Sequence, residues 1–305
     1  MEKPVKRIVR VGAPVAVLTL VVMYLGISYL IASGVTKAER NEQEDSLGAY
    51  GVEFETIEFE SRRGDVTLDG WYVPPVSQHS VIIYVHGIGS VRTGDGLTDL
   101  AARLHQRGFG ALMFDLRAHG SSGGDKISGG YHERFDVLGG YDYLLARGVE
   151  PDDIGVLGMS MGAGTAALAA AEEPGIEALI LDSPYAKASE LIAQETARKT
   201  PFPEWFVPLF EPGVDVLADL LFDIDIEALA PEAAVANLGY PLMVIYGTDD
   251  TRIPTDHSQR VYDAAPAGST VWVVEGVEHT DAFVEKPDEY SSRVAEYFLE
   301  RLGAE

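Results

Sequence analysis

The residue whose setting most suggests chemistry is Ser160, at the centre of the stretch GMSMG. An apolar run at 154–158 indicates a buried strand before it, and an alanine-rich run at 162–172 indicates a helix after it. A strand that turns straight into a helix crowds the backbone, so this turn requires small residues on both sides, here Gly158 and Gly162. The turn would lift the hydroxyl above the sheet and place the Met161 N–H at the helix start, where the helix dipole favours negative charge. The pattern predicts a nucleophile beside a cradle for an oxyanion.

A serine hydroxyl is a weak nucleophile until a base removes its proton, and the base needs an orienting acid. Two loops that follow late apolar runs could supply both: VIYGTDDTRIP and VVEGVEHTDAF. The first offers Asp249 or Asp250 as the acid, and the second offers His279 as the base. A further histidine, His257, begins a helical run, and we expect it to lie on the surface of that helix.

In this order the three stretches resemble the α/β-hydrolase family, and the resemblance covers residues 52–302. Nucleophile, acid and base follow in this chain order in that family. Its acid commonly stands three residues after a glycine and four before a proline. Gly247 and Pro254 reproduce that spacing around Asp250 and favour it over Asp249. The catalytic triad that the resemblance implies is Ser160, Asp250 and His279.

The stretch YVHGIGS matches the family's His-Gly loop after the first buried strand. The resemblance implies an oxyanion hole formed by the backbone N–H groups of Ile88 and Met161. Asp182, which also ends an apolar run, ranks below Asp250 as the acid, because the family usually has a structural turn at this position. The stretch DLRAHGSSGG at 115–124 also resembles a loop of the family. Its residues Asp115, Arg117 and His119, and His86 of the His-Gly loop, are expected to brace these loops rather than to catalyse.

Continuous apolar runs alternate with helical stretches through most of the chain, which predicts an α/β fold with a mostly parallel central sheet and helices on both faces. The expected strands of this sheet are 81–85, 110–115, 154–158, 177–182, 241–247 and 270–276. Alternating apolar and polar residues within 52–73 predict an antiparallel hairpin before them. The interval 186–238 contains no good strand and is rich in aromatic residues, so we expect a helical cap insertion there.

The N-terminus has the features of a membrane anchor. Residues 11–33 form a run of 23 residues without a charge, long enough to cross about 30 Å of hydrocarbon. Basic residues precede the run, so the N-terminus is expected in the cytoplasm and the catalytic domain outside it. A cleaved signal peptide is the competing interpretation, but its apolar core spans only about 7–15 residues, which favours an uncleaved anchor. We therefore predict a single-pass anchor over 1–34, a polar linker over 35–51, and an α/β-hydrolase domain over 52–305.

The composition of the 305 residues excludes several functions. A net charge of −25 argues against nucleic acid as a partner, and the absence of cysteine excludes disulfides and thiolate sites. No cluster of residues has metal-ligand spacing, and we expect no cofactor. The predicted function is hydrolysis of a small-molecule carboxylic ester or thioester, within the Bem46-like or serine aminopeptidase S33-like branch of the family. The alternatives are a serine peptidase and a non-catalytic binding protein of the same fold.

Overall fold

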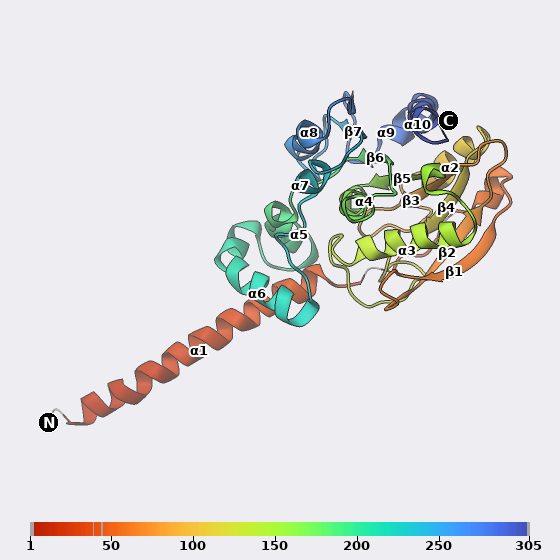
Figure 1. Ribbon diagram of the computed structural model, residues 1–305. Coiled ribbons are helices and arrows are strands. Elements are labelled where there is room, and N and C mark those ends of the chain that lie inside the picture. The colour runs from red at the N-terminus through yellow and green to blue at the C-terminus, as the bar shows by residue number, and fades with distance from the viewer. Residues whose placement is uncertain (1–2, 39, 44, 304–305) are drawn as a thin grey trace. The chain divides into compact units, whose positions relative to one another are not determined.

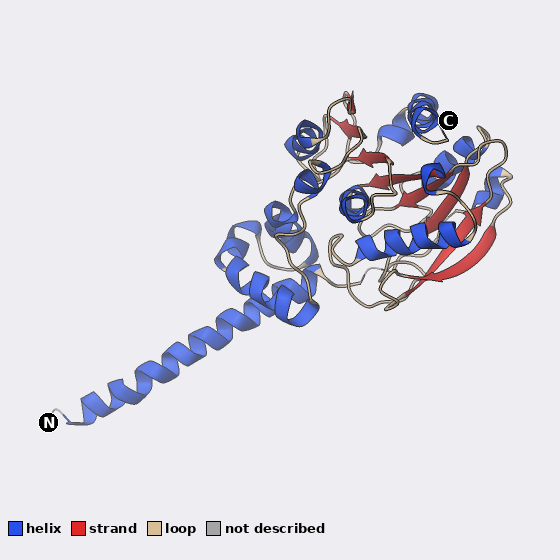
Figure 2. Ribbon diagram, viewed as in Figure 1, coloured by secondary structure: helices blue, strands red, loops and turns tan. Residues whose placement is uncertain are grey.

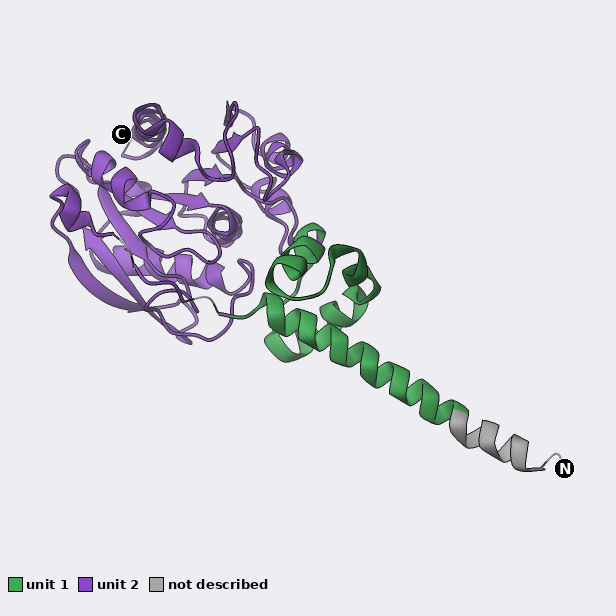
Figure 3. Cartoon of the chain, turned by 180° about the vertical axis from the view of Figure 1, so that it is seen from behind, with its two compact units in different colours: residues 1–37, 190–226 green, residues 38–189, 227–305 purple. Residues whose placement is uncertain are grey.

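The computed structural model describes residues 3–38, 40–43 and 45–303, so parts of the expected anchor and linker lie outside the described residues. The chain forms two compact units, distinguished by colour in Figure 3. Residues 1–37 and 190–226 make up the first, which we call the helical unit. Residues 38–189 and 227–305 make up the second, the sheet unit.

The sheet unit is built on eight strands in the order β1-β2-β4-β3-β5-β6-β7-β8 (Figures 1 and 2). The strands are β1 (Glu55–Glu60), β2 (Thr67–Val73), β3 (Val81–Val85), β4 (Gly110–Phe114), β5 (Ile154–Met159), β6 (Ala178–Asp182), β7 (Met243–Gly247) and β8 (Thr270–Val274). β1 and β2 form an antiparallel hairpin, and β2 is also antiparallel to β4. From β4 to β8 every pair is parallel, which confirms the predicted sheet.

Helices cover both faces of this sheet because successive residues of its central strands point to opposite sides. Ile83 and Val85 of β3 pack in one core, with α3 (Glu133–Ala146), α4 (Met161–Glu172) and α8 (Thr255–Ala264). Ile82 and Tyr84 pack in the other, with α2 (Leu97–His105), α9 (Ala282–Glu285) and α10 (Pro287–Arg301). A strand buried on both faces must be apolar throughout, which is why these runs stood out in the sequence.

The predicted insertion at 186–238 is divided between the two units. Its part in the helical unit contains α5 (Ile192–Lys199), the 3-10 helix η4 (Glu204–Leu209) and α6 (Glu211–Phe222). The short helix α7 (Pro231–Val235) belongs to the sheet unit, where Val235 is fully buried in the core beside α4. The insertion proper is therefore 190–226, shorter than the interval that lacks strands.

The helical unit is assembled on α1 (Lys3–Val35). The later part of α1 contributes Ile31 and Ala32 to a small core with Val207, Phe210 and Val214 of the insertion. Aromatic residues of the insertion gather in and around this core, namely Phe202, Phe206, Phe210 and Phe222. By length and composition, Ala13–Val35 of α1 could cross a membrane.

Candidate active site

Ser160 occupies the turn between β5 and α4 and adopts φ 56° and ψ −122°, a conformation that side chains seldom adopt. The turn is possible because its neighbours lack side chains. A Cβ at Gly158 would overlap the carbonyl of Gly162, and one at Gly162 would overlap the carbonyl of Val85. The two glycines of GMSMG are thus a steric requirement of the sharp bend that presents the serine hydroxyl.

The three residues predicted as a triad meet at this turn. Ser160 Oγ lies 2.7 Å from His279 Nε2, and His279 Nδ1 lies 2.7 Å from Asp250 Oδ2. The other carboxylate oxygen of Asp250 accepts hydrogen bonds from the N–H groups of Arg252 and Ile253, at 2.9 and 2.8 Å. The Asp250 side chain is almost completely buried, so its orientation is fixed and its charge is directed at the imidazole.

The two alternative residues considered from sequence, Asp249 and His257, are not part of this hydrogen-bonded series. Asp249 is exposed, and its carboxylate accepts a hydrogen bond of 2.9 Å from Thr248 Oγ1. His257 is buried rather than on the helix surface as expected, and its Nδ1 accepts the N–H of Ala186 at 3.1 Å. The ring of His257 therefore secures the chain that follows β6.

The loop after β3 lies against the nucleophile. A Cβ at Gly87 would be 3.2 Å from Ser160 Cβ, which is a tight contact, so glycine at residue 87 favours the close approach of the loop to the serine. Ile88 follows directly, and Met161 is the first residue of α4. Amide N–H groups at these two positions are the predicted oxyanion donors, and a helix N-terminus adds favourable potential for negative charge.

Two buried histidines hold this loop in place, and their rings meet edge to face at 4.9 Å. His86 Nδ1 lies 2.8 Å from Gly87 O, and its Nε2 accepts the N–H of Leu116 at 3.0 Å. Burial and the neighbouring His119 lower the pKa of His86 to about 3, so its ring is neutral. His119 Nε2 in turn accepts the N–H of Gly89 at 3.3 Å. Both side chains brace the backbone that carries Ile88.

Acidic residues behind the site are held by dense hydrogen bonding. Asp115 accepts the N–H groups of Arg92 and Ser121 at 2.9 and 3.0 Å. Arg117 makes a buried ion pair with Asp136 at 2.7 Å. Burial raises the pKa of Asp136 to about 6, although Arg117 acts in the opposite direction. Asp115 and Arg117 thus stabilise the loop after β4.

Sequence reasoning did not find the contacts that Asp182 makes around the nucleophile. The carbonyl of Asp182 accepts the N–H of Ser160 at 2.8 Å. Its carboxylate accepts hydrogen bonds from Tyr290 OH at 2.8 Å and Ser183 Oγ at 3.1 Å. Tyr290 lies on α10, more than a hundred residues away in the chain, and no local pattern indicates such a partner.

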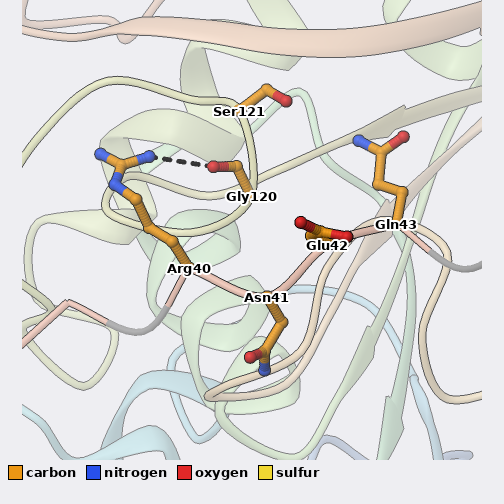
Figure 4. A pocket seen from close by; sticks show the side chains of 6 residues that line it. All are labelled: Arg40, Asn41, Glu42, Gln43, Gly120 and Ser121. Atoms are coloured by element: carbon orange, nitrogen blue, oxygen red, sulfur yellow. Dashed lines mark hydrogen bonds between the residues drawn. The ribbon is translucent and has the colours of Figure 1, made fainter.

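Residues 40–43, at the start of the sheet unit, contact the loops after β3 and β4. Arg40 donates hydrogen bonds to the carbonyls of Gly120, Ser122 and Gly124 at 3.0, 2.6 and 2.6 Å. Asn41 Nδ2 donates to the carbonyl of Gly89, in the loop that carries Ile88. Figure 4 shows the hollow along this segment, with Arg40 directed at Gly120. The residues that line the hollow are Arg40, Asn41, Glu42, Gln43, Gly120 and Ser121.

Among the described residues, no group of three or more histidine, aspartate and glutamate side chains is arranged to hold a metal ion. The functional groups that the site presents are a hydroxyl, an imidazole and a carboxylate in hydrogen-bonded series, next to backbone amides. This arrangement can deprotonate the hydroxyl as it attacks a carbonyl carbon, and it can return the proton to a leaving group.

The sequence is similar to a peptidase family, to a bacterial protein and to a lipase. Residues 77–223 match the family described as Serine aminopeptidase, S33. The chain is 28% identical over 238 residues to the protein YqkD of Bacillus subtilis (strain 168), covering 77% of this chain and 76% of YqkD. It is 30% identical over 207 residues to the lysophosphatidylserine lipase ABHD12 of Macaca fascicularis, covering 65% of this chain and 49% of ABHD12. The match thus spans about half of that lipase.

Solved structures agree in fold. The esterase Pf2001 of Pyrococcus furiosus superposes with a TM-score of 0.69 and 25% sequence identity. The superposition covers 88% of this chain and 98% of the esterase. The fold of this chain is therefore similar to that of a solved esterase.

Proposed function

Because the chain belongs to the α/β-hydrolase superfamily, we propose that it is a serine hydrolase that cleaves a carboxylic ester or thioester. The observation that carries the proposal is the continuous hydrogen-bonded series from Ser160 Oγ through His279 to Asp250. The names of two similar proteins, an esterase and a lipase, support ester chemistry.

In the proposed mechanism, Ser160 Oγ attacks the carbonyl carbon of the substrate while its proton passes to His279 Nε2. The amides of Ile88 and Met161 hold the developing oxyanion, and each donor is worth about 3 kcal/mol in the transition state. The bond to the leaving group breaks as His279 delivers the proton to the departing oxygen or sulfur. Water then attacks the acyl-enzyme through the same histidine and releases a carboxylic acid. Asp250 holds the imidazole tautomer throughout.

Peptide bond cleavage is the second candidate, and the match to a serine aminopeptidase family favours it. The two candidates share the nucleophile and differ in the leaving group, since an amine must be protonated before it departs. Comparing p-nitrophenyl esters of increasing acyl length with aminoacyl anilides separates them. A kcat/KM that is higher on the anilides than on the esters would show that the protein cleaves peptides rather than esters.

The nucleophile itself is tested with a serine-reactive fluorophosphonate probe on the full chain in detergent micelles. We expect wild type to be labelled and Ser160→Ala to lose the label. Ser121→Ala, which changes a serine outside the triad, is the matched control and should label like wild type. Labelling that persists in Ser160→Ala would remove Ser160 from the mechanism.

We further propose that α1 anchors the chain in a membrane, with the N-terminus in the cytoplasm and the sheet unit outside. The uncharged run and the basic residues before it support this orientation. An anchored chain stays in the membrane pellet after an alkaline carbonate wash, whereas a peripheral chain is released. A protease added outside intact cells should reach the sheet unit.

A further inference from the structure

The later part of α1 presents two different faces within the helical unit. One face packs on the insertion: Ser28, Ile31 and Ala32 are buried. Outside this face Leu25 and Leu30 remain 42% and 56% exposed. If this stretch stood in water, a row of apolar side chains would be solvated beside the insertion. The exposed face therefore belongs in lipid, and the insertion is attached at the same level of the helix.

The length of the uncovered part of α1 supports the same depth. The ring of Tyr24 in α1 stacks on Phe210 of the insertion at 5.2 Å, and the side chains of 13–23 before it are exposed. From Val11, the first residue after Arg10, to Met23 the helix rises only about 20 Å. The hydrocarbon core is about 30 Å thick, so the uncovered part falls about 10 Å short of crossing it. The part of α1 that packs on the insertion must therefore also lie in the hydrocarbon, which places the insertion in the outer leaflet.

Polar groups of the run are satisfied in the way that this depth requires. The hydroxyl of Tyr24 accepts the N–H of Gly213 at 3.2 Å, and Ser28 Oγ donates to the carbonyl of Phe210 at 3.4 Å. In the uncovered part, Thr19 Oγ1 donates to the carbonyl of Val15 at 2.9 Å, within its own helix. Hydroxyls at bilayer depth need such partners because lipid offers none.

The insertion has an apolar surface of its own, which no described residue covers. Trp205 and Leu220 are 75% and 73% exposed. We call the following set the apolar surface: Trp205, Leu209, Val216, Leu220 and Leu221. On α6, Val216 and Leu220 are one turn apart, and so are the exposed Asp215 and Asp219 beside them. α6 thus has an apolar edge and an acidic edge, as a helix lying in a membrane interface does.

We propose that the apolar surface of the insertion is immersed in the outer leaflet of the bilayer that α1 spans, with Asp215 and Asp219 at the headgroups. The inference rests on the anchoring proposed above. The occupant is lipid because the insertion packs on α1, whose uncovered part is too short to cross the hydrocarbon core by itself. The insertion has more acidic than basic residues, so burial of apolar side chains, rather than attraction to anionic lipid, holds it there.

The absence of native cysteine allows a direct test with single-cysteine variants of the full chain. Trp205→Cys and Leu220→Cys report on the apolar surface, and Asp219→Cys is the matched control on the acidic edge of the same helix. Val76→Cys, an exposed apolar residue of the sheet unit, is the second control. Each variant is labelled with an environment-sensitive fluorophore and reconstituted in phosphatidylcholine vesicles, with or without lipid carrying a nitroxide in its upper acyl chain.

We expect the nitroxide lipid to quench labels at 205 and 220 several-fold more than labels at 219 and 76. Labels at 205 and 220 that remain in water, in a chain that resists carbonate extraction, would overturn the immersion and leave the anchor standing. Labels that are sheltered but not quenched by lipid would mean that a second copy covers the surface, which also overturns the proposal. Release of the whole chain by carbonate would refute the anchor itself. Unchanged fluorophosphonate labelling shows that each variant is folded.

Discussion

The backbone N–H of Ser160 donates a 2.8 Å hydrogen bond to the carbonyl of Asp182, the last residue of the neighbouring strand β6. The carboxylate of the same aspartate is fully buried and accepts the hydroxyl of Tyr290 at 2.8 Å. The nucleophile turn, the end of β6 and α10 are thereby joined through one residue. The ionisation of that residue should therefore be visible in the stability of the whole sheet unit.

Burial raises the pKa of Asp182 from 3.8 to about 6, despite hydrogen bonds from Tyr290 and Ser183 that favour the ionised form. The resulting stabilisation is fully present below about pH 4, and it is lost as the pH rises through 6, where the folded state must release the proton. The loss is about 3 kcal/mol. Asp182→Asn should therefore flatten the pH dependence of the thermal midpoint between pH 4 and 7. An unchanged profile would contradict this assignment.

Adjacent aspartates provide a test of the acid in the triad. Asp250→Asn keeps the size of the side chain but removes the charge that orients His279, so kcat should fall about 10⁴-fold. Asp249→Asn changes the exposed neighbour and should leave kcat within a few-fold of wild type. Ester turnover by the two variants, measured side by side, checks the prediction. Equal losses would mean that the loop, and not the carboxylate of Asp250, is what catalysis needs.

The packing of the nucleophile turn predicts an unusually costly small substitution. Gly162→Ala places a methyl group against the carbonyl of Val85, and the sheet cannot yield without breaking its register. We expect a destabilisation of about 3 kcal/mol, seen as a lower thermal midpoint and weaker fluorophosphonate labelling. Gly239→Ala is the control, because a Cβ there meets nothing within 4 Å. If both variants melt together, steric crowding is not what demands glycine at 162.

Arg40 should order the loop after β4. Arg40→Ala removes a cation that bonds three carbonyls, and the exchange of backbone amides across 118–126 should become faster. Because the contact is exposed, the effect on global stability should stay near 1 kcal/mol. Hydrogen exchange read by mass spectrometry measures both effects. Lys37→Ala removes a positive charge three residues earlier in the chain and should leave this loop unaffected, which distinguishes hydrogen bonding from net charge.

Much of the sheet unit could be predicted because its central strands are buried on both faces. Each of the runs from 81–85 to 270–276 is mostly apolar, and the structure contains a parallel strand in each. The nucleophile turn was equally readable, since the glycines at 158 and 162 are required by local sterics. Asp250 was chosen over Asp249 only through the family spacing, because composition does not distinguish two neighbouring aspartates.

Long-range partners were not readable in the same way. An apolar run such as 11–33 looks the same whether lipid or protein covers it, so the packing of Tyr24 and Ser28 on the insertion left no signature. His257 was expected on the surface of its helix, yet it is buried where that helix meets the chain after β6. Tyr290 contacts Asp182 only because the fold brings α10 beside β6. These contacts depend on tertiary structure rather than on local pattern.

Because Ser160 has a positive φ, thermal stability and catalytic activity make opposite demands on the residue at this position. An L-residue with a side chain adopts such a backbone at a cost of about 1–3 kcal/mol, which glycine largely avoids. A chain with Ser160→Gly should therefore be inert towards esters and yet outlast the active protein on heating. The fold thus keeps a strained backbone at the position where the reaction needs a hydroxyl.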